Sequence, residues 1–298
     1  MSEQTLSMPL PPTGRWRAVT PAGEESVQLV AGRLDRTLLA TDFDGTLSPI
    51  VEDPTQARMH PAAREVLRQL APRLGQLAVI TGRGVDVVRQ LADFEAEPAF
   101  GQVLVLGQYG QEAWDAASGE VTNPPAPLSI RAARDQVNDL LARNAELDFL
   151  AGVAVEDKGR AVGVHTRRAT DPVAAYEWLT EPLGNIAAAH ELVLEPGRNV
   201  IELRSSSTTK GEALELLVQR AHPEVVVMMG DDLGDLTAFA AVRALAGSEV
   251  RGLCVVAGSA EQPVVAQQAD VLCGGPEGVA AWLADVAQAA DASGGVAR

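Results

Sequence analysis

Two short acidic motifs carry residue types suited to phosphoryl transfer, and each follows a strongly apolar segment. Residues 37–41 lead into Asp42 and Asp44, and residues 225–229 lead into the motif at 230–235. A carboxylate can attack phosphorus, and a second carboxyl nearby can protonate the leaving alkoxide and later activate water. An isolated Asp-x-Asp is common in solvated turns. Two acidic motifs that each end an apolar segment instead indicate that one carboxylate of the Asp42–Asp44 pair can act as a nucleophile and the other as a general acid and base.

The same carboxylates offer the hard oxygen ligands that Mg²⁺ prefers. A divalent cation would offset the repulsion between a carboxylate nucleophile and a phosphate, so the sequence predicts a magnesium site. In a parallel sheet, the carboxylates of both acidic motifs could converge on one cation.

Two weaker motifs add groups that can hold phosphate oxygens. Thr81-Gly82-Arg83 follows the apolar segment 76–80 and offers a hydroxyl and backbone N–H groups, so we assign Gly82 and Arg83 to substrate binding. Lys210 opens a predicted helix, where its charge and the helix dipole both favour an anion. Alone, each motif would be an ordinary glycine turn or a solvated lysine. Their weight comes from occurring with the acidic motifs.

Predicted strands alternate with predicted helices on both sides of these motifs. This alternation indicates an α/β fold with a mostly parallel sheet covered by helices on both faces, and ligands bind at the carboxyl ends of such strands. The predicted strands cover residues 37–41, 76–80, 103–106, 225–229, 253–256 and 270–272.

The pattern changes after the proline-rich segment 123–127. A helix, a hairpin, a second helix and a second hairpin follow, which is typical of a self-contained α+β unit inserted into the first domain. We therefore expect a catalytic core over 34–124 and 204–290 and an α+β cap over 125–203. Residues 1–33 read as a flexible lead-in rich in proline, and residues 291–298 as a frayed tail.

Composition narrows the class of partner. The chain of 298 residues carries 24 basic and 40 acidic residues, a net charge of −16, which argues against nucleic acid or an anionic membrane surface. Any phosphate site must therefore depend on local donors and a metal. Cys254 and Cys273 form no Cys-x-x-Cys pair and are expected to be buried and reduced. With no signal-peptide pattern and no apolar span, we expect a cytoplasmic protein.

The four motifs, in this order, resemble the haloacid-dehalogenase (HAD) superfamily. There, a second Asp two residues after the nucleophile is typical of phosphatases, whereas dehalogenases and P-type ATPases carry other residues. A closer resemblance, to the trehalose-6-phosphate phosphatases, spans roughly residues 37–272. It rests on Asp42-Phe43-Asp44-Gly45-Thr46-Leu47-Ser48-Pro49-Ile50, Val155-Glu156-Asp157-Lys158-Gly159, His165-Thr166-Arg167 and Asn199-Val200-Ile201-Glu202-Leu203-Arg204.

This resemblance implies a Mg²⁺-dependent phosphomonoesterase that hydrolyses trehalose 6-phosphate through an aspartyl-phosphate. It implies a HAD-like Rossmannoid core and a cap that recognises the sugar, and it adds association with a trehalose-phosphate synthase as an expected partner. Its catalytic residues would be Asp42 as the nucleophile, Asp44 as the general acid and base, Thr81 and Lys210. Its metal ligands would be Asp42, the backbone carbonyl of Asp44, Asp231 and Asp235, with Asp232 as further support. Its sugar-binding residues in the cap would be Glu156, Lys158, Arg167, Asn199 and Glu202.

Some features leave alternatives open. The family often carries Thr-Asp-Glu after the Asp-Asp pair, where this chain has Gly234-Asp235-Leu236, and many members carry His where this chain has Tyr109. Without the resemblance, Glu156 and Lys158 would be an exposed ion pair worth little. The alternative functions are hydrolysis of sucrose phosphate or a glycosyl-glycerate phosphate, a non-catalytic sugar-phosphate sensor, and a phosphotransferase.

Overall fold

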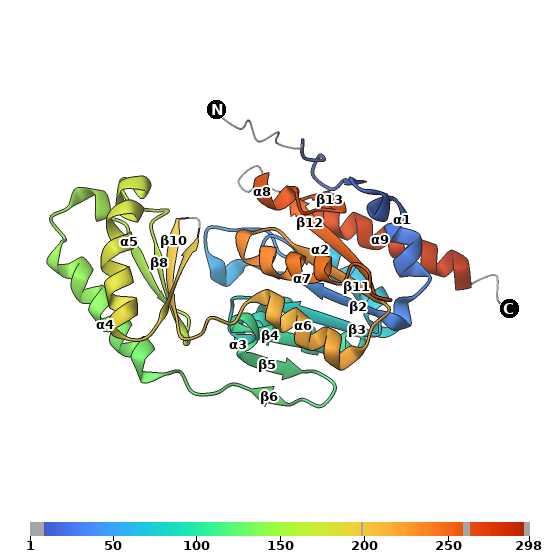
Figure 1. The fold of residues 1–298 in the computed structure, drawn as a ribbon, viewed down its shortest axis with the longest axis horizontal. Coiled ribbons are helices and arrows are strands. Elements are labelled where there is room, and N and C mark those ends of the chain that lie inside the picture. Colours follow the sequence, from blue (N-terminus) through green and yellow to red (C-terminus); the bar gives the residue numbers. More distant parts are fainter. Residues whose placement is uncertain (1–8, 198, 259–262, 295–298) are drawn as a thin grey trace. The chain divides into compact units, whose positions relative to one another are not determined.

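The computed structural model describes residues 9–197, 199–258 and 263–294, and the chain divides into two compact units. The core unit combines Met1–Asn123 with Thr208–Arg298, and the cap unit, Pro124–Ser207, is inserted between these two segments (Figure 1). Each unit has its own sheet and its own apolar core.

The core unit contains a nine-stranded sheet with the order β1-β13-β12-β11-β2-β3-β4-β5-β6. The six strands from β13 to β4 run parallel, and antiparallel strands flank them at both edges. The strands are β1 (Trp16–Ala18), β2 (Thr37–Thr41), β3 (Gln76–Ile80), β4 (Val103–Gly107), β5 (Glu112–Asp115), β6 (Val121–Thr122), β11 (Val225–Gly230), β12 (Arg251–Gly258) and β13 (Val271–Gly274). The predicted α/β class is confirmed.

Helices cover both faces of this sheet because its central strands are apolar on both faces. Leu39 and Val227 belong to one apolar cluster with α1, α2, α3 and α9, whereas Leu38 and Val226 belong to a second cluster with α6, α7 and α8. The helices are α1 (Pro21–Ala31), α2 (Pro61–Leu70), α3 (Val85–Ala92), α6 (Lys210–Ala221), α7 (Leu236–Ala244), α8 (Pro263–Ala266) and α9 (Gly275–Gly294). None of the helices in the described ranges is long and apolar enough to cross a membrane.

The expectation of a flexible lead-in is wrong for residues 16–31. Strand β1 pairs with β13, and α1 begins at Pro21. The hydroxyl of Thr20 accepts a hydrogen bond from Gly23 N and donates one to the buried carboxylate of Asp270. Proline here occupies the first turn of a helix, where its missing N–H costs nothing. Residues 1–8 of the lead-in lie outside the described residues.

The expected tail is likewise helical at its start, because α9 continues to Gly294. Residues 295–298 lie outside the described residues. This end of the chain contributes Trp282, Leu283 and Val286 to the same apolar cluster as α1, so the two ends of the core unit pack on one face of the sheet.

The cap unit contains a four-stranded antiparallel sheet in the order β7-β8-β10-β9. Alternation along its strands separates two faces: Val164 and Ile201 pack against the cap helices, while Glu156 and Glu202 point to the opposite face. Its elements are α4 (Leu128–Arg143), β7 (Ala154–Asp157), β8 (Ala161–His165), α5 (Pro172–Ala189), β9 (Val193–Gly197) and β10 (Val200–Arg204). One face of the cap sheet is therefore charged.

Candidate active site

The two acidic motifs meet where the chain direction across the sheet reverses. Strands β2 and β11 are neighbours, although the chain proceeds from β2 to β3 on the other side. Asp42 follows β2 directly, and its N–H donates to the carbonyl of Met229 on β11 at 2.8 Å. Asp231 follows β11 at the same end of the sheet. Such a reversal leaves a crevice at the carboxyl ends of the strands, the usual ligand site of open α/β sheets.

The loop after Asp42 folds closely against the second motif. Gly45 has φ +73°, and its N–H donates to the carbonyl of Ser48 at 2.7 Å. The hydroxyl of Thr46 donates to Asp231 Oδ1 at 3.1 Å. A methyl group at position 45 would lie 2.0 Å from Asp231 Oδ2. Only glycine therefore permits both the turn and the approach of the Asp231 carboxylate.

Lys210 joins the same cluster from α6. Its Nζ lies 2.9 Å from Asp42 Oδ1 and 2.8 Å from Asp235 Oδ1, and its side chain is 3% exposed. A capping box between Thr209 and Glu212 fixes the start of this helix. The lysine is therefore a buried partner of the predicted nucleophile, and not the solvated side chain that its position alone would suggest.

Asp235 is fully buried, and both of its carboxylate oxygens already have partners. Oδ1 accepts from Lys210, and Oδ2 accepts from the backbone N–H groups of Asp231 (2.9 Å) and Asp232 (3.1 Å). These contacts fit a residue that holds the lysine and the acidic turn in place. They favour a supporting role for Asp235 over direct ligation.

The cluster holds more negative than positive charge. Burial, together with Asp235 and Asp232 and against the attraction of Lys210, raises the pKa of Asp42 well above its ordinary value. Burial also raises the pKa of Asp231 well above its ordinary value, and the neighbouring carboxylate of Asp42 raises it further. Burial alone would lower the pKa of Lys210, but Asp235 and Asp42 outweigh it and hold that pKa well above its ordinary value.

This donor set fits a hard cation. Oxygens of Asp42, Asp232 and Asp235 lie within 4.8 Å of one another. The carboxylate of Asp231 lies against Gly45, in the loop that follows Asp42. Carboxylates buried with an excess of like charge are stabilised by a bound divalent ion, and oxygen ligands select Mg²⁺ over softer metals.

We expect the metal-free protein to lose stability as the pH rises towards neutral. The pKa of Asp235, raised mainly by burial, is about 6 in the folded protein. A raised folded pKa means that the native state holds the proton more tightly than the unfolded state does. The protonated Asp235 therefore contributes to the free energy of unfolding below about pH 4, and this contribution is lost as the pH rises through 6. Melting temperatures in EDTA should therefore fall between pH 5 and pH 7, and Mg²⁺ at pH 7 should restore them.

Asp235→Asn provides the control for this expectation, because it removes the carboxyl group whose folded pKa is about 6. The variant should show a weaker dependence on pH and a smaller gain from Mg²⁺. Equal pH profiles for the wild type and the variant in EDTA would contradict the assignment of the effect to this cluster.

The turn at Thr81-Gly82-Arg83 is tied to the loop after β4. The carbonyls of Thr81 and Arg83 accept from the N–H groups of Tyr109 and Gln108, each at 2.9 Å, and Gln108 Nε2 donates to the carbonyl of Gly82 at 3.0 Å. Gln108 and Tyr109 both have positive φ, a strained conformation that non-glycine residues adopt mainly where the surroundings impose it. The structure thus builds the predicted phosphate-binding turn as a rigid unit.

Arg83 lies in a place that its motif does not reveal. Its Nε and Nη2 donate to Asp44 Oδ2 (2.5 Å) and Oδ1 (2.7 Å), and its backbone N–H donates to the hydroxyl of Thr81 at 3.2 Å. Arg83 was expected to bind substrate, yet its guanidinium is bound side-on to the predicted general acid and base.

In the cap unit, three of the five predicted sugar-binding residues form one cluster. Lys158 forms an ion pair with Glu202 and lies 3.8 Å from Glu156, whose carboxylate contacts His165 Nε2 at 2.8 Å. All lie on the charged face of the cap sheet, where carboxylates and an ammonium can bind sugar hydroxyls.

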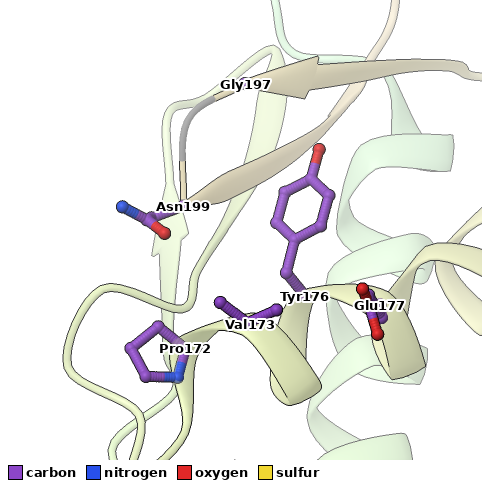
Figure 2. A pocket seen from close by; sticks show the side chains of 6 residues that line it. All are labelled: Pro172, Val173, Tyr176, Glu177, Gly197 and Asn199. Carbon is purple, nitrogen blue, oxygen red and sulfur yellow. The ribbon is translucent and has the colours of Figure 1, made fainter. Parts of the chain in front are cut away.

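The structure does not bring the other two predicted cap residues into this cluster. Arg167 is exposed in the turn after β8. Asn199 has φ +53° and lines a separate pocket of 290 Å³. Tyr176 and the first turn of α5 line the same pocket (Figure 2). For Arg167 and Asn199, a role in sugar binding stays a prediction.

A model of the trehalose-phosphatase family matches residues 40–270, which contain both acidic motifs, the Thr81 turn, Lys210 and the whole cap. The chain belongs to the trehalose-phosphatase family. This confirms the family resemblance stated from the motifs, and the inserted cap lies inside the matched region.

Individual trehalose phosphatases agree with this membership. A probable trehalose-phosphate phosphatase of Sinorhizobium fredii is 30% identical over 232 residues, covering 77% of this chain and 82% of that protein. The Mycobacterium tuberculosis trehalose-phosphate phosphatase is 33% identical over 211 residues, covering 66% of this chain but 49% of that longer protein. The C-terminal domain of Candida albicans trehalose-6-phosphate phosphatase shares the fold, with a TM-score of 0.72 at 22% identity over 91% of this chain and 99% of that domain.

Several site residues of this trehalose-phosphatase family member escaped sequence reasoning. Thr46 supports Asp231, Gln108 braces the phosphate turn, and Glu112 accepts a hydrogen bond from Val85 N at the start of α3 at 2.8 Å. The signal for Gln108 was available, because a polar residue directly after an apolar strand is the same signal that identified Asp42. Tyr109 packs on Gly82, where a methyl group would lie 2.8 Å from the tyrosine hydroxyl.

Proposed function

We propose that this chain hydrolyses trehalose 6-phosphate to trehalose and phosphate through an aspartyl-phosphate on Asp42. The observation that carries the proposal is the convergence of Asp42, Lys210 and Asp231 in one buried cluster, because these groups come from distant parts of the chain. Membership of the trehalose-phosphatase family gives the substrate class.

The reaction needs two displacements at phosphorus. Asp42 attacks in line, so a carboxylate–phosphorus bond forms as the bond to the sugar oxygen breaks, and Asp44 gives its proton to that oxygen. Asp44 then takes a proton from water, which attacks the aspartyl-phosphate and frees Asp42. Lys210, the Thr81 hydroxyl and the backbone N–H of Gly82 hold the phosphoryl oxygens, and positioning and charge neutralisation supply most of the acceleration.

A divalent cation, Mg²⁺, would be held by Asp42, the backbone carbonyl of Asp44 and Asp231. When bound it supplies positive charge that offsets repulsion between the nucleophile and the phosphate. Asp235 would support the site through its hydrogen bonds to the backbone of Asp231 and Asp232, and the exposed carboxylate of Asp232 would support it from the solvent side. The single positive charge of Lys210 cannot balance the negative charges of the buried carboxylates. This excess of negative charge supports the proposed dependence on Mg²⁺.

The cap unit supplies sugar recognition in this proposal. Glu156, Lys158 and Glu202 present charged groups on one face of the cap sheet, and hydrogen bonds to sugar hydroxyls reject analogues that lack them. Arg167 and Asn199 are proposed to add further contacts. We further propose that the protein works in the cytoplasm and that a trehalose-phosphate synthase, the source of its substrate, is its partner.

A panel of sugar phosphates tests the proposal. Trehalose 6-phosphate, sucrose phosphate, a glycosyl-glycerate phosphate and glucose 6-phosphate are incubated with the protein in Mg²⁺ or EDTA, and phosphate release is measured with malachite green. We expect release from trehalose 6-phosphate in Mg²⁺ and none in EDTA. Preference for another member of the panel would reassign the substrate, and tight binding without release would indicate a sensor.

A further inference from the structure

The side chain of Asp44 is held by one partner whose role the family motifs do not assign. The Arg83 guanidinium binds both carboxylate oxygens of Asp44, at 2.5 and 2.7 Å, in the bidentate geometry that fixes a carboxylate in one plane. Both side chains are partly shielded, with exposed fractions of 19% and 34%. The pair is therefore placed to set an orientation more than to stabilise the fold.

The backbone around Asp44 is already fixed without Arg83. Gly45 N donates to Ser48 O, and Ser48 N donates to Phe43 O at 2.9 Å, so a tight turn encloses the residue. What remains free in Asp44 is the rotation of its carboxylate. The bidentate contact with Arg83 restricts this rotation.

Arg83 is itself held at both ends. Its backbone N–H donates to the hydroxyl of Thr81, and its Nη1 donates to the carbonyl of Pro54 at 3.0 Å. Pro54 lies in a short turn capped by Asp53, which accepts from Thr55 N at 3.0 Å. The arginine thus connects the phosphate turn, the loop after the nucleophile and the carboxylate of Asp44.

We infer that Arg83 is a positioning residue that aims the carboxylate of Asp44 at the leaving oxygen of the substrate. The inference rests on the proposed function, in which Asp44 transfers a proton to that oxygen. Each carboxylate oxygen keeps a lone pair when a guanidinium binds side-on, so one oxygen can still carry the proton. The proton moves from Asp44 to the sugar oxygen as the oxygen–phosphorus bond breaks. Asp44 later takes a proton from the water that attacks the aspartyl-phosphate.

A comparison of leaving groups separates this role from phosphate binding. The nitrophenolate of p-nitrophenyl phosphate departs without a proton, whereas a sugar alkoxide needs one. For Arg83→Gln we expect kcat/KM on trehalose 6-phosphate to fall about 10²-fold. On p-nitrophenyl phosphate, kcat/KM should stay within roughly threefold of the wild-type value, because kcat/KM reports the steps up to departure of the leaving group. Arg83→Lys keeps the positive charge but loses the pair of N–H donors that binds both oxygens of Asp44, so it should show the same difference between the two substrates. Added guanidinium ions should partly restore the activity of Arg83→Gln on the sugar phosphate.

The control is Arg58→Gln, which removes an exposed arginine that donates to Gln90 O at 3.1 Å, and both substrates should keep their rates. An equal loss on both substrates, with a raised KM, would overturn the inference and make Arg83 a phosphate ligand. Unchanged rates on both would also overturn it. The wild-type substrate panel decides the proposed function separately, and if another sugar phosphate is the substrate, the same ratio is measured with that compound.

Discussion

Asp42→Asn should eliminate phosphate release from trehalose 6-phosphate, with a loss of at least about 10⁴-fold in kcat, because it removes the proposed covalent nucleophile. The amide is nearly the same size as the carboxylate and still offers an oxygen to Lys210, which lies 2.9 Å from Asp42 Oδ1. It cannot attack phosphorus. Malachite green assays in Mg²⁺, together with acid quenching of ³²P-labelled enzyme, measure both the loss of turnover and the loss of the phospho-enzyme.

We expect the same variant to stay folded, so that its loss of turnover can be attributed to the missing nucleophile. Burial and nearby carboxylates raise the pKa of Asp42, so replacing it by a neutral amide relieves repulsion in the metal-free protein. We expect its melting temperature in EDTA at pH 7 to equal or exceed that of the wild type. Phosphate release from a preparation shown by mass spectrometry to contain no reverted aspartate would refute the covalent role of Asp42.

The ends of the parallel strands could be located from the sequence because the physical signal there is local. Asp42, Thr81 and Asp231 each stand just beyond an apolar segment, and a buried parallel strand must end where polar residues begin. Parallel strands then bring their carboxyl ends to one edge of the sheet. The encounter of the two acidic motifs follows from that topology, without knowledge of any individual contact.

The partners of long side chains could not be located in this way. Arg83 has several rotatable bonds, and nothing in its neighbours indicates that it turns towards Asp44 and away from the phosphate turn. The role of Asp235 depends on the one-turn helix Leu233–Asp235, which turns its carboxylate back onto the backbone N–H groups of Asp231 and Asp232. The strand and helix at residues 16–31 were missed because proline was interpreted as a breaker, although it is equally suited to the first turn of a helix.

Gly45→Ala should reduce kcat/KM about 10²-fold or more, because a shift of about 1 Å in a catalytic group costs that much. The added methyl would lie 2.0 Å from Asp231 Oδ2, so either the nucleophile loop or the Asp231 carboxylate must move. The φ of +73° adds about 1–3 kcal/mol of backbone strain for any residue with a side chain. Thermal denaturation with and without Mg²⁺ measures the strain and the damage to the metal site separately.

Gly119→Ala is the matched control, because Gly119 has φ +72° and no atom within 4 Å of the position that a methyl group would occupy. In both variants the new side chain must adopt a positive φ, so both should lose a similar amount of stability through backbone strain. Only Gly45→Ala brings a methyl group against Asp231, so only that variant should lose activity and the stabilisation by Mg²⁺. Equal activity losses in the two variants would mean that the contact between the acidic motifs is not needed for catalysis.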